Sequence, residues 1–92
     1  MATFSGTQDP QDKLDRTFDW STALVGGETI STSTWTASPS GLTLSSPSNT
    51  TTTTSTWATG GTSGSIYALV NHVVTSAGRE YDRTLNLSIA DL

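Results

Sequence analysis

The sequence predicts an all-β domain, a sandwich of six to seven short antiparallel strands. Threonine and serine are heavily used, and these residues favour pleated, half-buried surfaces and tight turns over helices. Turn-forming clusters of Gly, Pro and Ser recur at short intervals and leave no segment long enough for a substantial helix. Three Trp, two Tyr and two Phe provide the large apolar side chains that a disordered chain lacks.

The composition also limits the classes of function. A chain of 92 residues supports one hydrophobic core, and without cysteine it has neither a disulfide framework nor a thiolate metal site. A net charge of -4 leaves few cations for phosphates, so we expect binding to neither nucleic acid nor membrane. The chain shows no membrane-spanning apolar run and no signal-peptide pattern, so we expect a soluble, unprocessed protein.

The first thirteen residues predict an extended N-terminal arm preceding the domain at 14–92. Polar residues, Gly and Pro fill this segment, and Phe4 is its only large apolar residue besides the initiator Met. With no face to bury, residues 1–13 are expected to be either a flexible tail or a docking arm that becomes ordered on a neighbouring subunit. If the segment is a docking arm, deleting residues 1–13 should leave the domain folded but weaken assembly. Phe4, Asp9 and Pro10 are therefore candidate interface residues.

The next segments alternate between strands and turns. Leu14, Phe18 and Trp20 alternate with polar residues and predict a strand at 14–20, followed by a connection at 21–27. A second strand is expected at 29–36.

Ile30 and Trp35 have opposite parity in this second strand, so both can face inward only if a bulge separates them. Leu42 and Leu44 begin a short third strand, expected at a sheet edge and ending at Pro47. The threonine-rich segment 51–59 is expected to be the fourth strand.

The last two strands are predicted to form a hairpin whose register the sequence selects. A three-residue loop, Ser76-Ala77-Gly78, with Gly78 in the left-handed conformation places every large apolar partner on one face. A two-residue turn would instead oppose apolar to polar residues. The pairs expected are Thr75 with Arg79, Val73 with Tyr81, Asn71 with Arg83, Leu69 with Leu85, and Tyr67 with Leu87.

No group of residues predicts catalysis, a cofactor or a metal site. His72 is the only histidine, so neither a catalytic triad nor a histidine metal site can be completed. It is expected to be a surface or interface residue of its strand. The carboxylates of Asp15, Asp19, Glu80 and Asp82 are expected on solvent faces, without the surroundings that raise the pKa of a catalytic acid. The protein is therefore predicted not to be an enzyme.

Trp57 is the residue most open to a binding role. If Ala58 and the methyl group of Thr56 face the core, Trp57 has the opposite parity and stands outside the domain as a binding anchor. The alternative, Trp57 in the core, is about equally compatible with the sequence, because large aromatic residues are usually buried.

Several stretches together are similar to a known family. The stretches are Asp9-Pro10, Leu14-Asp15, Thr17-Phe18-Asp19-Trp20-Ser21, Thr29-Ile30, Ser33-Thr34-Trp35-Thr36, Gly41-Leu42-Thr43, Gly60-Gly61-Thr62, Gly64, Tyr67, Asn71 and Ala77-Gly78-Arg79. They resemble small tailed-bacteriophage virion proteins of the fiber-tail adaptor type. The resemblance covers nearly all of the chain after Asp9. It implies an immunoglobulin-like β-sandwich located in the virion, bound to other structural proteins and without catalytic activity.

Two functions therefore remain. The first is a phage virion adaptor that joins fibers or other appendages to the tail, with tail, fiber or capsid subunits as partners and a homo-oligomer in the particle. The second is a capsid-surface decoration protein or a carbohydrate-binding immunoglobulin-like module, in which exposed aromatic residues stack on partners or sugars. No cofactor is expected for either function.

Overall fold

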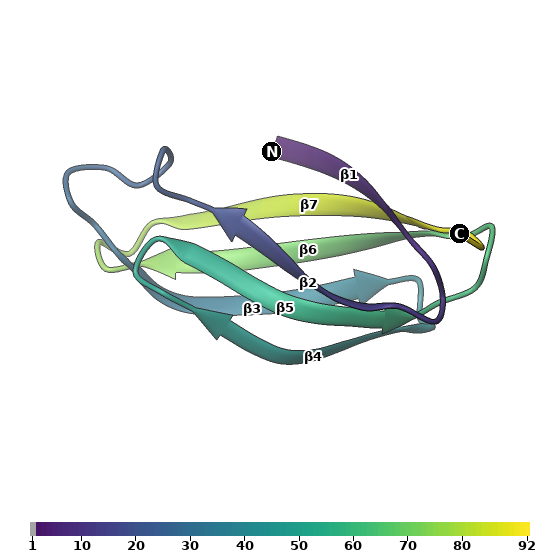
Figure 1. Ribbon diagram of the computed structural model, residues 1–92. Helices are drawn as coiled ribbons and strands as arrows, with labels where there is room; N and C mark the ends of the chain where they lie inside the picture. The colour runs from purple at the N-terminus through teal and green to yellow at the C-terminus, as the bar shows by residue number, and fades with distance from the viewer. Residues whose placement is uncertain (1) are drawn as a thin grey trace.

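Seven β-strands in two packed sheets form the structure, a computed structural model that describes residues 2–92 (Figure 1). The strands are β1 (Ala2–Gln8), β2 (Lys13–Asp19), β3 (Ile30–Ser38), β4 (Leu42–Asn49), β5 (Thr53–Gly60), β6 (Ile66–Thr75) and β7 (Glu80–Ile89). The described residues include no helix long and apolar enough to cross a membrane.

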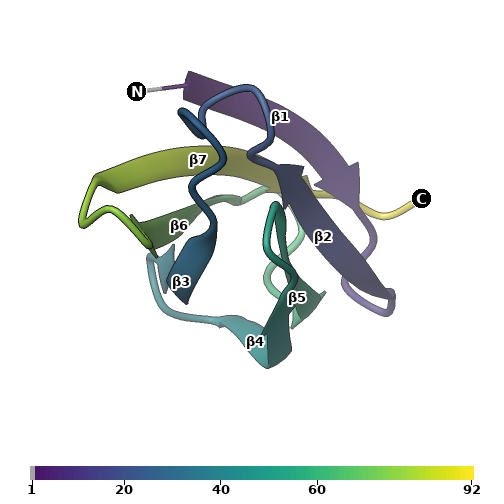
Figure 2. The same cartoon turned by 90° about the vertical axis from the view of Figure 1, so that its left-hand side faces the viewer.

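The strands form a four-stranded sheet with the order β1-β7-β6-β3 and a three-stranded sheet with the order β2-β5-β4. Figure 2 shows the two layers end-on, with β1 above β2 on one side and β3 beside β4 on the other. Neighbouring strands are antiparallel except β1 and β7, which run parallel. The prediction of an all-β sandwich is confirmed, and the prediction that every strand is antiparallel is wrong at this one pair.

The predicted N-terminal arm is also wrong, because residues 2–8 are an integral strand of the first sheet. β1 pairs with β7 along its whole length, from Ala2 opposite Arg83 to Gln8 opposite Ile89. Gln8 is fully buried although it is polar, and its Nε2 donates to the carbonyl oxygen of Ala58 at 2.7 Å. Its Oε1 accepts from the guanidinium of Arg16 at 2.6 Å. Gln8 thus ties the first sheet to the second.

The predicted register of the final hairpin is confirmed. Tyr67 lies opposite Leu87, Leu69 opposite Leu85 and Val73 opposite Tyr81, and Thr75 donates its backbone N–H to the carbonyl oxygen of Arg79 at 2.8 Å. Gly78 has φ = 84°, in the left-handed region that the three-residue loop requires.

The middle strands follow the sequence pattern with one difference. The expected bulge in β3 lies between Ile30 and Thr32. β4 is an edge strand as predicted, but it continues past Pro47 to Asn49, because a register shift between Ser45 and Ser48 accommodates the proline. β5 is the central strand of its sheet and buries Thr54, Thr56 and Ala58 on the inner face.

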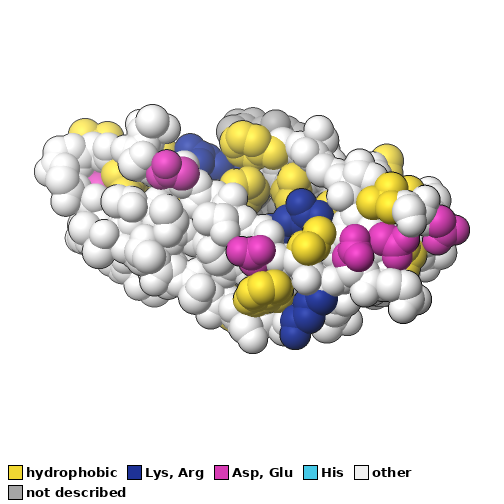
Figure 3. All heavy atoms as spheres, in the orientation of Figure 1, with side chains coloured by type: hydrophobic (Ala, Val, Ile, Leu, Met, Phe, Trp, Pro, Cys, Tyr) yellow, Lys and Arg dark blue, Asp and Glu magenta, His cyan; other side chains and the backbone are white. Residues whose placement is uncertain are grey.

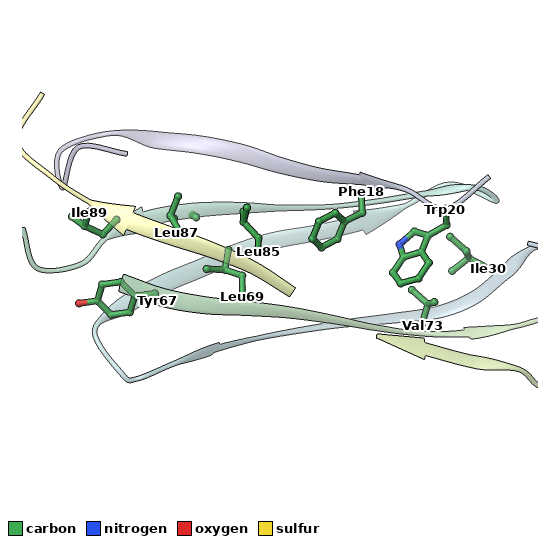
Figure 4. Close-up of a cluster of buried hydrophobic side chains, with 10 residues drawn as sticks. Phe18, Trp20, Ile30, Tyr67, Leu69, Val73, Leu85, Leu87 and Ile89 are labelled. Atoms are coloured by element: carbon green, nitrogen blue, oxygen red, sulfur yellow. The ribbon is translucent and has the colours of Figure 1, made fainter. Parts of the chain in front are cut away.

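The hydrophobic core fills the space between the sheets (Figure 4). Its buried members are Phe18, Trp20, Ile30, Ala58, Tyr67, Leu69, Val73, Leu85, Leu87 and Ile89. Most of these side chains come from β6 and β7, so the final hairpin supplies the main apolar surface on which the second sheet packs.

A polar cluster centred on Asn71 crosses the middle of this core, and we call it the Asn71 clamp. Asn71 Oδ1 accepts from Trp20 Nε1 at 3.1 Å and from Thr54 Oγ1 at 2.5 Å. Asn71 Nδ2 donates to Ser33 Oγ at 2.9 Å and to the carbonyl oxygen of Thr34 at 3.0 Å. Both donors and both acceptor positions of the amide are thereby used, so the group is buried without an unsatisfied atom.

The Asn71 clamp predicts a large loss of stability on truncation. Asn71→Ala removes the buried acceptor of the Thr54 hydroxyl and one of the two acceptors of the Trp20 indole, whose Nε1 also donates to Thr54 Oγ1 at 3.0 Å. We expect the free energy of unfolding to fall by about 2 kcal/mol, the cost of the lost buried hydrogen bonds and of one hydroxyl donor left unsatisfied. Urea denaturation followed by tryptophan fluorescence measures this. Asn49→Ala, at an exposed asparagine, is the matched control, and equal stabilities of the two variants would contradict the assignment.

β1 predicts a second effect on stability. Gln8→Ala leaves the carbonyl oxygen of Ala58 and the guanidinium of Arg16 without their buried partner, so we expect a loss of about 2 kcal/mol. Thr7→Ala, at the exposed neighbouring position of the same strand, should change the free energy of unfolding by less than about 0.5 kcal/mol. A Gln8→Ala variant as stable as the Thr7→Ala variant would show that β1 can leave the sheet at little cost, as a loosely attached arm would.

Candidate functional site

An open groove lies where β1 of the first sheet faces β2 of the second, and we call it the aromatic groove. Its volume is about 380 Å³. The residues that line it are Phe4, Asp15, Arg16, Thr17, Phe18, Asp19, Trp35, Arg83 and Leu85. In the face shown in Figure 3, hydrophobic side chains gather around the middle of the molecule beside a positively charged one. The groove combines apolar walls with a charged rim.

Three aromatic rings are in continuous contact through the groove, and we call them the stack, although the Phe4 ring is tilted by 42° to the Phe18 ring. The ring of Phe4 lies 5.3 Å from that of Phe18, and Phe18 in turn stacks on Trp35 at 5.3 Å with nearly parallel planes. Phe18 is buried, whereas the Phe4 side of the stack opens to solvent, with 44% of Phe4 exposed. The rings come from β1, β2 and β3, so both sheets hold the stack in place.

The charged rim of the groove is fixed by hydrogen bonds. Arg16 is bound to the buried Gln8, and Arg83 donates to the carbonyl oxygen of Asp19. The guanidinium of Arg83 also lies over the ring of Trp20, 4.2 Å from the ring centroid, in a cation–π contact. The carboxylate of Asp19 accepts from the backbone N–H of Ser21, which lowers the pKa of Asp19 below its ordinary value. The rim therefore presents both signs of charge in fixed positions.

Trp57 lies on the outer face of β5, next to the groove. It stands opposite Asp15, which lines the groove, and opposite Ser45 on its other side. Its inner-face neighbours Thr56 and Ala58 are fully buried, while Trp57 is 39% exposed. Of the two alternatives that the sequence leaves open, the structure has the exposed indole.

Asp9 and Pro10 lie in the turn that joins β1 to β2 and are not among the residues that line the groove. The carboxylate of Asp9 accepts from the backbone N–H of Leu92 at 2.8 Å and from that of Gln11 at 2.8 Å. These two bonds hold the pKa of Asp9 below its ordinary value. Asp9 thus fastens the turn to the C-terminal end of the chain.

His72 lies away from the groove, on the outer face of the first sheet. Its Nδ1 is 2.5 Å from Asp82 and its Nε2 is 2.9 Å from Glu80. Hydrogen bonds first to Asp82 and then to Glu80 raise the pKa of His72. The two carboxylates lie on opposite edges of the imidazole. Within residues 2–92, no group of three or more His, Cys, Asp or Glu side chains is placed to hold a metal ion.

Comparison with known families identifies the chain. A family model described as podophage GP4 fiber-tail adaptor protein gp77 matches residues 8–88. The chain belongs to this family. The adaptor is a structural component of the phage virion tail that contacts tail and fiber proteins, and it is not an enzyme. A search of curated proteins gives no match.

The family confirms the resemblance found in the sequence and corresponds to the first of the two predicted functions. The sequence nevertheless did not predict that Phe18, Trp35, Arg83 and Phe4 would line one groove. Phe18 and Trp35 were expected in strands with inward apolar faces, and Phe4 in a separate arm. The available signal is Phe4, a large apolar residue in an otherwise polar segment. It indicates a place in the groove only once β1 is known to pair with β7.

The contacts of His72 predict a dependence of the adaptor's stability on pH. Because the pKa is raised on folding, the ion pairs stabilise the folded adaptor fully below the ordinary pKa of about 6.5 and are lost as pH rises through the folded pKa. His72→Gln should therefore reduce the free energy of unfolding at about pH 6 and have no such effect at about pH 9. Denaturation at the two pH values measures this, and NMR titration of the single histidine checks the shift directly. A His72 pKa at or below the ordinary value would contradict the prediction.

Proposed function

We propose that the adaptor binds one of its virion partners through the aromatic groove and Trp57, and that it works as a homo-oligomer. The observation that carries the first part is the stack of three rings from Trp35 through Phe18 to the half-exposed Phe4. Aromatic anchors seated in preformed pockets contribute most of the energy of protein interfaces. The stack is already ordered by both sheets, so little entropy is lost when a partner covers it.

The surroundings of the groove support a protein partner. Phe4, Leu14 and Trp57 are large apolar residues that remain about two-fifths exposed. The charges of Arg16, held by Gln8, and of Asp15 lie among them, which is the pattern of an apolar interface centre with a polar rim. We include the turn residues Asp9 and Pro10 in the proposed interface as contacts outside the groove.

The small size of the domain supports the homo-oligomer. Its 92 residues have axes of 43 × 23 × 20 Å, and most soluble oligomers combine identical subunits in closed symmetry, which repeats each contact in every subunit. We propose His72, on the outer face of the first sheet, as a contact between neighbouring copies.

We also propose that the sandwich is immunoglobulin-like. The sheets β2-β5-β4 and β3-β6-β7 have the order of strands B-E-D and C-F-G of an immunoglobulin domain, with β1 placed beside the last strand. The Tyr67 hydroxyl, near the start of β6, accepts from the backbone N–H of Thr62, as in a tyrosine corner. Trp35 on the third strand stacks on Phe18 of the second, where antibody domains have a tryptophan against a disulfide.

Substitution of the exposed aromatic residues tests the proposed interface. We expect Trp57→Ala and Phe4→Ala each to weaken binding of the adaptor to one partner, purified tail or purified fiber of the same phage, by tenfold or more. Surface plasmon resonance with each partner measures the affinities. Ile66→Ala, at an apolar residue exposed on the outer face of β6, is the matched control and should leave both affinities unchanged.

Trp57 is the decisive position because its side chain lies outside the core, so its truncation leaves the fold intact. A folded Trp57→Ala, Phe4→Ala double variant that binds tail and fiber as tightly as the unmodified adaptor would refute the proposed interface.

A further inference from the structure

The free edge of β3 is unusually open to pairing with another strand. β3 pairs with β6 on one side and has no strand on the other among the described residues. Its nine residues include no charged residue and no proline, and its bulge between Ile30 and Thr32 lies at the N-terminal end of the strand, so residues 32–38 pair regularly with β6. Proteins normally protect exposed strand edges with charges, prolines or bulges, because an unprotected edge accepts foreign strands.

Both edges of the second sheet carry such protection. β2 has four charged residues among its seven, and β4 has Pro47 together with a bulge in which Ser46 adopts φ = 48°. At the other end of the first sheet, β1 borders the aromatic groove, which the proposed function already assigns to a partner. Beyond the bulge at its N-terminal end, residues 32–38 of β3 carry none of these protections, so they form the unprotected edge that remains.

A second groove runs beside this edge, between β3 and β4. Its volume is about 280 Å³, and its lining residues are Ser33, Thr34, Trp35, Leu44, Pro47 and Thr56. Leu44, Pro47 and Trp35 give it an apolar character, so a side chain from a strand laid along β3 would find an apolar pocket there. Strand addition commonly combines main-chain hydrogen bonds for affinity with such pockets for specificity.

The indole N–H of Trp35 lacks a hydrogen-bond acceptor that a bound strand could supply. Its Nε1 is buried and, within the part of the chain that the structure describes, is the one buried side-chain nitrogen or oxygen without a hydrogen-bond partner. Trp35 lines both grooves. A buried donor without an acceptor costs about 1–3 kcal/mol, and a bound chain brings backbone carbonyl groups that can act as acceptors.

We propose that the edge of β3 receives an extended, uncharged strand from the second of the adaptor's two partners, by β-strand addition. This inference rests on the proposed function, which places the first partner in the aromatic groove. β1 and β3 are opposite edges of the first sheet, and β2 and β4 are opposite edges of the second, so the two surfaces lie on opposite sides of the domain (Figure 2). An adaptor needs two such separate surfaces to join two proteins.

The chemistry of β3 defines the strand that fits. Thr32, Thr34 and Thr36 form an exposed row on the outer face, which suits small polar or β-branched side chains opposite them. The inner face of the added strand would carry an apolar side chain toward Leu44 and Pro47. Pairing of β3 with β3 of a second copy is the competing arrangement, but it would bury this edge in both copies and leave only one surface for two partners.

Hydrogen exchange with each partner tests the proposal. Purified adaptor is mixed with purified tail or with purified fiber, and amide exchange is followed by mass spectrometry. We expect one of the two to slow exchange at 30–38 by tenfold or more, without a comparable change at 42–49. Thr36→Lys should weaken binding of that same partner by tenfold or more, and Thr43→Lys, on the protected edge strand β4, should not.

Three outcomes would overturn it. The first is unchanged exchange at 30–38 with both partners. The second is a Thr36→Cys adaptor that forms a disulfide-linked dimer in the absence of partners, while a Thr43→Cys adaptor does not. Because the chain has no native cysteine, such a dimer would assign the edge of β3 to a second copy of the adaptor. The third is that Thr36→Lys and Trp57→Ala both abolish binding of the same partner, which would mean that the edge of β3 and the aromatic groove bind one protein. Loss of binding in Trp57→Ala alone keeps the proposed function and rejects only the added strand.

Discussion

The Asn71 clamp is the constraint on which the rest of the structure depends. A sandwich of 92 residues without a disulfide must be joined through its core, and one amide reaches β3, β5 and the end of β2 from its position on β6. Apolar packing alone tolerates sliding of one sheet over the other. The two hydrogen bonds from Trp20, at the end of β2, and from Thr54 of β5 do not, because both are lost when the sheets shift by an ångström or two. The bonds to Ser33 and Thr34 lie within the first sheet and hold the amide in place. The clamp therefore fixes the relative position of the two sheets.

The fixed relative position of the two sheets determines the shape of the two grooves at the sides of the domain. β1 joins the first sheet and β2 the second, so the chain crosses between layers at Asp9 and Pro10 and leaves the layers unpaired along that side. Gln8 holds this crossing by bonding to Ala58 and Arg16 of the opposite sheet. Gln8 thus links the two sheets at the edge of the sandwich, as Asn71 links them in the core.

Local patterns predicted the parts of the fold that depend on local rules. The alternation of residues 79–88 and the position of Gly78 were enough for the hairpin register, and opposite parities were enough for the bulge in β3. β1 could not be predicted in this way, because it pairs with a strand about eighty residues away and buries Gln8 in place of an apolar residue. The groove could not be predicted either, since it forms only where β1 and β2 lie in different layers.

The position of Trp35 has a consequence for genetics. One indole ring is part of the wall of both grooves, so the two sides of the domain are separated in the middle by a single side chain. With partners bound as proposed above, a phage with a smaller residue at this position would carry two altered partner-binding surfaces from one mutation. Suppressors of such a mutation would arise in either of two partner genes, whereas suppressors of a change at Trp57 would arise in one.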